Sequence, residues 1–124
     1  MRFWASLLAA SLLAFAPAQA GQKKRSPDEK DKIEALIRKM ENLEGATFIR
    51  NGIEYDARSA GAFLRGKWRS KKAAVKTARD FIERIASFSS ISGRPYLIRL
   101  KGGQEIKSGD FLRAELMKLV IPTK

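Results

Sequence analysis

The sequence predicts a single small α+β domain, in which an α-β-β-α unit occurs twice along the chain. Three observations lead to this prediction. Apolar residues recur at helical spacing in four stretches of residues 27–124. Two pairs of short β-forming stretches, each pair divided by a turn signal, lie between those helices. A chain of 124 residues leaves room for one such domain and no more.

The first predicted helix begins with Ser26, Pro27 and Glu29. Ser26 is expected to be the N-cap, Pro27 to take the first helical position and Glu29 to complete a capping box. The helix should stop at Gly45, because glycine is common just beyond a helix end. Its apolar positions share one face and are Ile33, Leu36, Ile37, Met40 and Leu43.

Residues 47–55 predict a β-hairpin, because Asn51 and Gly52 both tolerate the positive φ of a type I′ turn. A second, shorter helix should follow, with Gly66 weakening its end and a break over residues 71–74. Its apolar positions are Ala60, Phe63, Leu64 and Trp68. A third helix is defined by the apolar stripe of Val75, Ala78, Phe81, Ile82 and Ile85.

The second unit starts after a serine-rich loop at residues 87–95, which we call the serine loop. Gly93 is expected to be left-handed, and Pro95 should start an edge strand. Strands are predicted at 96–100 and 104–106 around Gly102-Gly103. Ser108 should cap a last helix, which Pro122 should terminate.

The two units share short matching segments. Ile49-Arg50, 52–54 and 59–65 correspond to Ile98-Arg99, 103–105 and 108–113. A duplication, two units under the same packing demands and a chance match are all compatible with this pattern. A duplication predicts a pseudo-two-fold axis, with the Phe-Leu pairs 63–64 and 111–112 at equivalent core positions.

Residues 1–20 predict a cleavable signal peptide. Arg2 precedes an uncharged apolar run over residues 3–16, and Ala18 and Ala20 provide the small-residue spacing that signal peptidase requires. Cleavage after Ala20 would leave a basic lead-in at 21–26, which is expected to be disordered. The mature protein is expected to be periplasmic and soluble, because no second apolar segment approaches membrane length.

The composition disfavours catalysis. The chain has no His and no Cys, so the commonest general base and the thiolate nucleophile are missing. The sequence contains no phosphate-cradling glycine loop and no G-x-S-x-G or S-x-x-K motif. We therefore expect no cofactor, no metal and no catalytic residue, and a protein that is not an enzyme.

Polar residues of the serine loop are one candidate binding site, made of Ser89, Ser90, Ser92 and Arg94. The loop could simply satisfy the carbonyl groups of the preceding helix end. Alternatively, its hydroxyl and backbone N–H groups could surround an anionic or sugar-like ligand. A Ser nucleophile activated by Lys101 is the enzymatic version of this hypothesis.

A basic tract is the other candidate. Residues 57–79 carry eight cations and no carboxylate, within a chain of net charge +12. Its candidate binding residues are Arg65, Lys67, Trp68, Arg69, Lys71 and Lys72. The tract could be a solvated face, or it could bind a polyanion such as lipopolysaccharide phosphates, anionic lipid headgroups or an acidic protein surface. Nucleic acid is disfavoured, because the chain carries no RRM, KH or helix-turn-helix signature.

Three segments, FIRNG at 48–52, TARDFI at 77–82 and ASFSSISGRPYLI at 86–98, resemble the YfeK-like family. These are small exported proteins of Gram-negative bacteria that carry a domain of unknown function. The resemblance covers roughly residues 27–120 and implies a periplasmic setting, but no activity or ligand.

Together these observations favour a non-enzymatic binding module for an acidic partner. The alternatives are an envelope enzyme or enzyme inhibitor that acts through residues 87–95, and a structural subunit completed by another chain.

Overall fold

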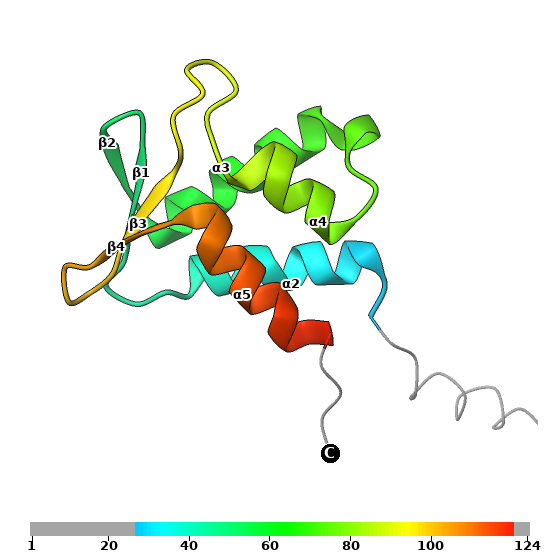
Figure 1. Ribbon diagram of the computed structural model, residues 1–124, viewed down its shortest axis with the longest axis horizontal. Helices are drawn as coiled ribbons and strands as arrows, with labels where there is room; N and C mark the ends of the chain where they lie inside the picture. Colours follow the sequence, from blue (N-terminus) through cyan, green and yellow to red (C-terminus); the bar gives the residue numbers. More distant parts are fainter. Residues whose placement is uncertain (1–26, 121–124) are drawn as a thin grey trace, which may run out of the picture.

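The computed structural model describes residues 27–120 and confirms an α+β fold (Figure 1). Its elements are α2 (Glu29–Glu41), β1 (Thr47–Arg50), β2 (Ile53–Asp56), α3 (Ala57–Ser70), the 3₁₀ turn η1 (Lys72–Ala74), α4 (Ala78–Phe81), the π-helical turn η2 (Ile82–Ala86), β3 (Leu97–Arg99), β4 (Glu105–Lys107) and α5 (Ser108–Val120). The expected signal peptide, its cleavage residues, the lead-in and the stop at Pro122 lie outside the described residues. Within 27–120, no helix has the length and apolar character needed to cross a membrane.

Two hairpins form one antiparallel sheet in the order β2-β1-β3-β4, which lies at one end of the helices (Figure 1). Cα pairing places Tyr55, Phe48, Ile98 and Ile106 in one row across the four strands. Phe48 and Ile98, in the middle of this row, are buried. The row therefore marks the face of the sheet that packs against the helices.

Helix α2 begins later than the sequence suggested. Its N-cap is Asp28, whose carboxylate accepts a 2.8 Å hydrogen bond from the Asp31 amide, and Asp31 completes the capping box. The expectation of Ser26 as N-cap with Glu29 at N3 is therefore wrong, because an aspartate two residues further on caps the same turn. The helix ends at Glu41, four residues before the predicted stop at Gly45. Gly45 has a positive φ and lies in the loop between α2 and β1. The predicted apolar stripe is confirmed: Ile33, Leu36, Ile37 and Met40 are buried and Leu43 is partly buried.

The first hairpin is confirmed, with positive φ at both Asn51 and Gly52. Helix α3, however, is a full 14 residues long, so the expectation of a shorter helix weakened at Gly66 is wrong. Its apolar face continues past that glycine to Trp68, which is only 8% exposed. This buried tryptophan offsets the modest cost of one helical glycine. The predicted break then appears as η1.

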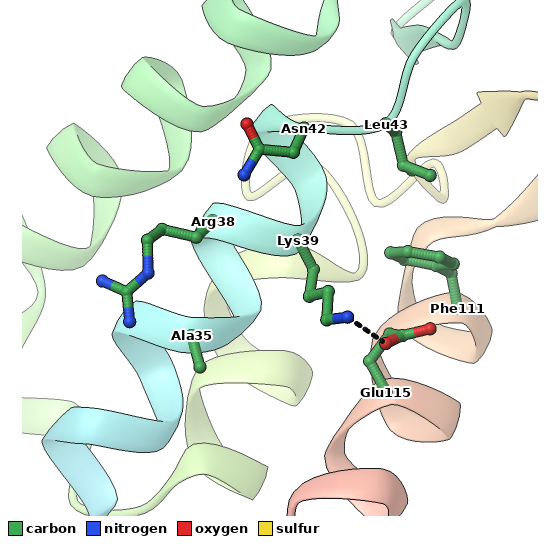
Figure 2. A pocket seen from close by; sticks show the side chains of 7 residues that line it. All are labelled: Ala35, Arg38, Lys39, Asn42, Leu43, Phe111 and Glu115. Carbon is green, nitrogen blue, oxygen red and sulfur yellow. Dashed lines mark ion pairs between the residues drawn. The ribbon is translucent and has the colours of Figure 1, made fainter.

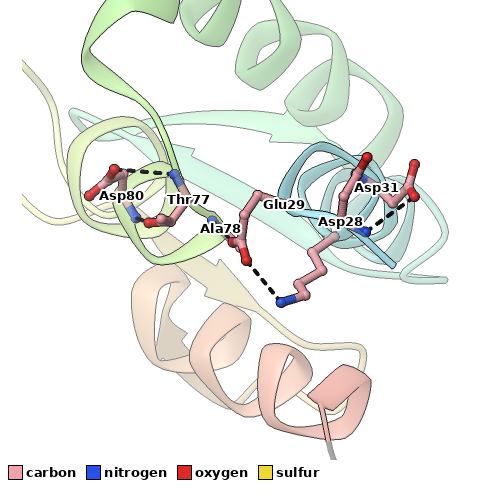
Figure 3. A network of polar contacts seen from close by, with 7 residues as sticks. Asp28, Glu29, Asp31, Thr77, Ala78 and Asp80 are labelled. Carbon is pink, nitrogen blue, oxygen red and sulfur yellow. Dashed lines mark hydrogen bonds and ion pairs between the residues drawn. The ribbon is translucent and has the colours of Figure 1, made fainter. Parts of the chain in front are cut away.

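The third predicted helix forms as α4 followed by η2, and a polar network fixes its start (Figure 3). Thr77 and Asp80 form a capping box. In addition, the carboxylate of Glu29 in α2 accepts a 2.7 Å hydrogen bond from the Ala78 amide. That bond, with a smaller effect of Lys32, lowers the pKa of Glu29. A side chain from α2 therefore helps to hold the first turn of α4 in place.

Two expectations for the second unit are wrong. Strand β3 is central rather than at an edge, so Pro95 does not begin an edge strand; it lies before β3 and forms an isolated bridge with Phe88. This position suits a residue that cannot donate to a β-ladder. Ser108 is the first residue of α5, and its buried hydroxyl has no hydrogen-bond partner among residues 27–120, so it is not a side-chain cap. The left-handed conformation of Gly93 is confirmed.

The residues that the internal repeat matches have equivalent environments in the helices but not in the strands. Leu64 and Leu112 are both fully buried. The β1–β3 register, however, pairs Ile49 with Leu97, which places Ile49 on the face opposite to buried Ile98. A two-fold axis between antiparallel neighbours would keep equivalent residues on the same face. Duplication therefore stays a hypothesis.

Candidate functional site

Arg65 is the one predicted tract residue with strong carboxylate partners among the described residues. Its guanidinium forms ion pairs with Glu34 and Glu41 of α2. The hydrogen bonds that its guanidinium donates to these two carboxylates raise the pKa of Arg65. Arg65 therefore joins α3 to α2, and its charge is largely compensated.

Arg65 and three further cations line a groove of about 180 Å³ between α2 and α3. We call it the α3 groove; its lining residues are Lys30, Glu34, Arg65, Trp68, Arg69 and Lys72. Trp68 packs edge-to-face on Phe81, with 6.0 Å between ring centroids. The Lys72 ammonium lies 5.7 Å from the Trp68 ring centroid, within the range of a cation–π contact. The groove thus combines a fixed indole with cationic groups.

The α3 groove brings together four of the six predicted tract residues and adds two residues of α2 that were not predicted, Glu34 and Lys30. Lys30 comes from α2, about 40 positions before Arg69 and Lys72. Among residues 27–120, none of these three cations takes part in an ion pair. Linear spacing could not reveal Lys30, because only the packing of α2 on α3 brings it to this position.

Lys67 lies away from the α3 groove and contacts the serine loop. Its ammonium donates to the Phe88 carbonyl and to the Tyr96 hydroxyl, each at 3.0 Å. Burial, with repulsion from Lys71 and Arg50, lowers the pKa of Lys67 to about 8. The tract therefore divides between two surfaces, and neither Lys67 nor Lys71 lines the groove.

Two serines hold the serine loop to the tip of the first hairpin. The buried Ser89 hydroxyl accepts from the amides of Ile91 and Ser92 at 3.2 Å, and from the Asn51 side chain at 3.3 Å. The Ser92 hydroxyl donates to the same asparagine at 2.6 Å. Ser87 donates to the Ile82 carbonyl at 2.6 Å, at the end of η2. These contacts show the loop stabilising itself and the helix end.

The other predicted members of the loop site lie apart from this network. Ser90 and Arg94 are exposed, and their side chains make no hydrogen bond with other described residues. Lys101 follows the far end of β3, where its side chain lies beside Gly45. The structure therefore does not bring Lys101 to the serines, and the lysine that reaches the loop is Lys67.

A second hollow, of about 480 Å³, lies over α2 and α5 (Figure 2). Glu115 is the one carboxylate among its lining residues. One oxygen of Glu115 lies 2.9 Å from the Lys118 ammonium and the other 3.7 Å from that of Lys39. A lone carboxylate between two lysines provides no acid–base pair. Throughout residues 27–120, no three His, Cys, Asp or Glu side chains lie close enough together to hold a metal ion.

Comparisons with known proteins give a family without an assigned activity. A family model described as "Family of unknown function (DUF5329)" matches residues 27–120. The "Uncharacterized protein YfeK" of Salmonella typhimurium is 35% identical over 68 residues. That match covers 55% of this chain and 57% of the relative, so it spans little more than half of either protein. No solved structure matches the chain.

Proposed function

The chain belongs to the family of unknown function DUF5329, and we propose that it is a non-enzymatic binding module whose α3 groove holds an acidic partner. The observation that supports this proposal most directly is the group of Lys30, Arg69 and Lys72 around Trp68. These cations have no ion-pair partner among the described residues. An anionic surface would supply the missing countercharge.

The distribution of carboxylates strengthens this argument. The chain has 25 basic and 13 acidic residues. Two of those carboxylates, Glu34 and Glu41, pair with Arg65 in the wall of the groove, which leaves the other cations of the groove uncompensated. A surface dominated by one sign of charge raises the local concentration of oppositely charged partners. Binding here should therefore weaken steeply as salt is added.

The partner's compartment is part of the proposal. Cleavage after Ala20 would place the mature chain in the periplasm, where lipopolysaccharide phosphates, anionic lipid headgroups and acidic proteins are the acidic surfaces available. Amino-terminal sequencing of the protein purified from periplasmic extract should begin at Gly21. Recovery of the uncut chain from the cytoplasm would contradict this placement.

Sedimentation with lipid vesicles tests the groove. We expect the protein to bind phosphatidylglycerol vesicles and heparin at low salt, and not pure phosphatidylcholine vesicles. The triple variant Lys30→Gln, Arg69→Gln, Lys72→Gln should lose at least about tenfold in affinity, because exposed cations near an anionic membrane contribute roughly 1 kcal/mol each.

A matched control removes the same charge elsewhere. Arg38, Lys101 and Lys107 also have no ion pair among the described residues, and their replacement by Gln changes the net charge equally. This control variant should bind much better than the groove variant. Equal losses would mean that net charge alone drives binding, and a wild-type protein that fails to bind either polyanion would reject the proposal.

A further inference from the structure

A pair of cations meets aromatic rings on the surface of α3 that faces the first hairpin. The Arg50 guanidinium lies 4.2 Å from the centroid of the Phe63 ring and 5.1 Å from that of Tyr55. It also donates a 2.9 Å hydrogen bond to the Tyr55 hydroxyl. The guanidinium is therefore held by two cation–π contacts and one hydrogen bond, and most of its five N–H donors have no side-chain partner among residues 27–120.

Lys67 lies over the neighbouring ring, which belongs to Tyr96. Its ammonium lies 4.9 Å from the Tyr96 centroid, in addition to its hydrogen bonds to the Tyr96 hydroxyl and the Phe88 carbonyl. The Phe63 and Tyr96 rings are edge-to-face, with centroids 5.8 Å apart. Arg50 and Lys67 therefore share one aromatic cluster, and one of the three ammonium donors remains free.

The charge of this pair is uncompensated. Neither cation has an ion pair among residues 27–120. The carboxylates of the same hairpin are engaged elsewhere, with Glu54 2.9 Å from Arg99 on the other face of the sheet and Asp56 capping α3. Burial lowers the pKa of Lys67 most, and repulsion from Lys71 and Arg50 lowers it further.

We propose that Arg50 and Lys67 form a second binding site, separate from the α3 groove, for one oxyanion group, a phosphate or a carboxylate. The anion would lie between a guanidinium and an ammonium, which are the two side-chain groups suited to oxyanion recognition. It would replace repulsion between the cations with two attractions. Asn51 donates a hydrogen bond to Ser89 and accepts one from Ser92, and these two bonds join the hairpin tip to the serine loop beside the pair.

Calorimetric titration at about pH 8 tests this site with sulfate, which does not itself titrate there. Half of the Lys67 amines should be neutral at this pH in the free protein, because the pKa is about 8. A bound anion should raise that pKa, so binding should take up roughly half a proton per site. Measurements in buffers with different enthalpies of ionisation give this number directly. Inorganic phosphate and acetate, titrated in parallel, then distinguish the two oxyanion classes by relative affinity.

Variants separate this site from the rest of the basic surface. Arg50→Gln and Lys67→Gln should each lower sulfate affinity by about tenfold or more. Lys67→Arg should still bind, but without proton uptake, because a guanidinium stays protonated. The groove variant should bind sulfate like the wild type, whatever its behaviour on heparin. Unchanged affinity in Arg50→Gln and Lys67→Gln, or the same proton uptake in Lys67→Arg, would overturn the assignment.

Discussion

The half-buried amine of Lys67 predicts an unusual rise of stability in mildly alkaline solution. Its pKa is about 8 in the folded protein, below the ordinary value of 10.5. Between these two pH values the unfolded chain retains a proton that the folded chain releases. The free energy of unfolding therefore increases with pH across this window. Below about pH 8 both states carry the proton, and the cost of burying the charged amine is present in full.

The size of the effect follows from the difference in pKa. A fall from 10.5 to about 8 corresponds to an upper bound of ~3 kcal/mol. Lys67 keeps part of its surface in solvent, which screens the repulsion from Arg50 and Lys71, so we expect 1 to 2 kcal/mol, as an order of magnitude. Burial raises the pKa of Tyr96, which has the opposite effect above about pH 10. The measurement therefore belongs between about pH 7 and about pH 9.5.

Urea denaturation followed by circular dichroism measures this directly in the wild type and in Lys67→Met. The variant should lack the rise, so the stability difference between the two proteins should shift by about 1 kcal/mol over the window. The slope is the relevant quantity, because Lys67→Met also leaves the Phe88 carbonyl without its side-chain donor. Lys107→Met, at an exposed position on β4 that does not act on the pKa of Lys67, is the control and should follow the wild type. Parallel curves for wild type and Lys67→Met would refute the reasoning.

Three further substitutions test the packing around the sites. Leu64→Ala should lower the free energy of unfolding by about 3 kcal/mol, because Leu64 is fully buried; a loss under about 1 kcal/mol in urea would contradict that burial. A Cβ at Gly61 would lie 2.1 Å from Cγ of Glu41. Gly61→Ala should therefore destabilise the wild type but stabilise a Glu41→Ala background by about 1 kcal/mol. If thermal melts show that Gly61→Ala changes the stability of both proteins in the same direction, the clash with Glu41 is contradicted. Glu29→Gln should cost about 1 kcal/mol at neutral pH, and the difference should vanish as the pH falls through the lowered pKa of Glu29; a pH-independent difference would rule out the carboxylate as the cap of Ala78.

Much of the fold could be predicted because its signals are local. The Asn51-Gly52 dipeptide requires a specific turn, and the apolar stripe of α2 follows directly from helical spacing. The errors occurred where two signals competed over a few residues. Asp28, not Ser26, is the N-cap of α2. Helix α3 continues beyond Gly66, because Trp68 is buried on its apolar face. Which of two competing signals sets a helix end depends on tertiary packing, and local sequence patterns do not report that packing.

The candidate sites show the same limit more strongly. The basic tract was visible as a run of cations, but its division into two surfaces depends on which side of α3 each residue occupies. Lys30 and Arg50 come from α2 and β1, so only the packing of these elements brings them to the tract. A side-chain partner on a distant element leaves no periodic signal in the sequence. The sequence shows that residue 67 is a lysine, but it does not show that its ammonium contacts the Tyr96 ring.

The topology of the sheet also affects the order of folding. Each hairpin pairs residues that are close in sequence, whereas the central pairing joins Phe48 to Ile98, fifty positions apart. Closing so long a loop costs more chain entropy than forming either hairpin, so we expect the β1–β3 ladder to form last. Until residues 97–99 have been synthesised, β1 has a free edge and Phe48 lacks its partner ring, Tyr96. A chain interrupted before β3 therefore presents a strand edge open to other chains, and aggregation should begin there.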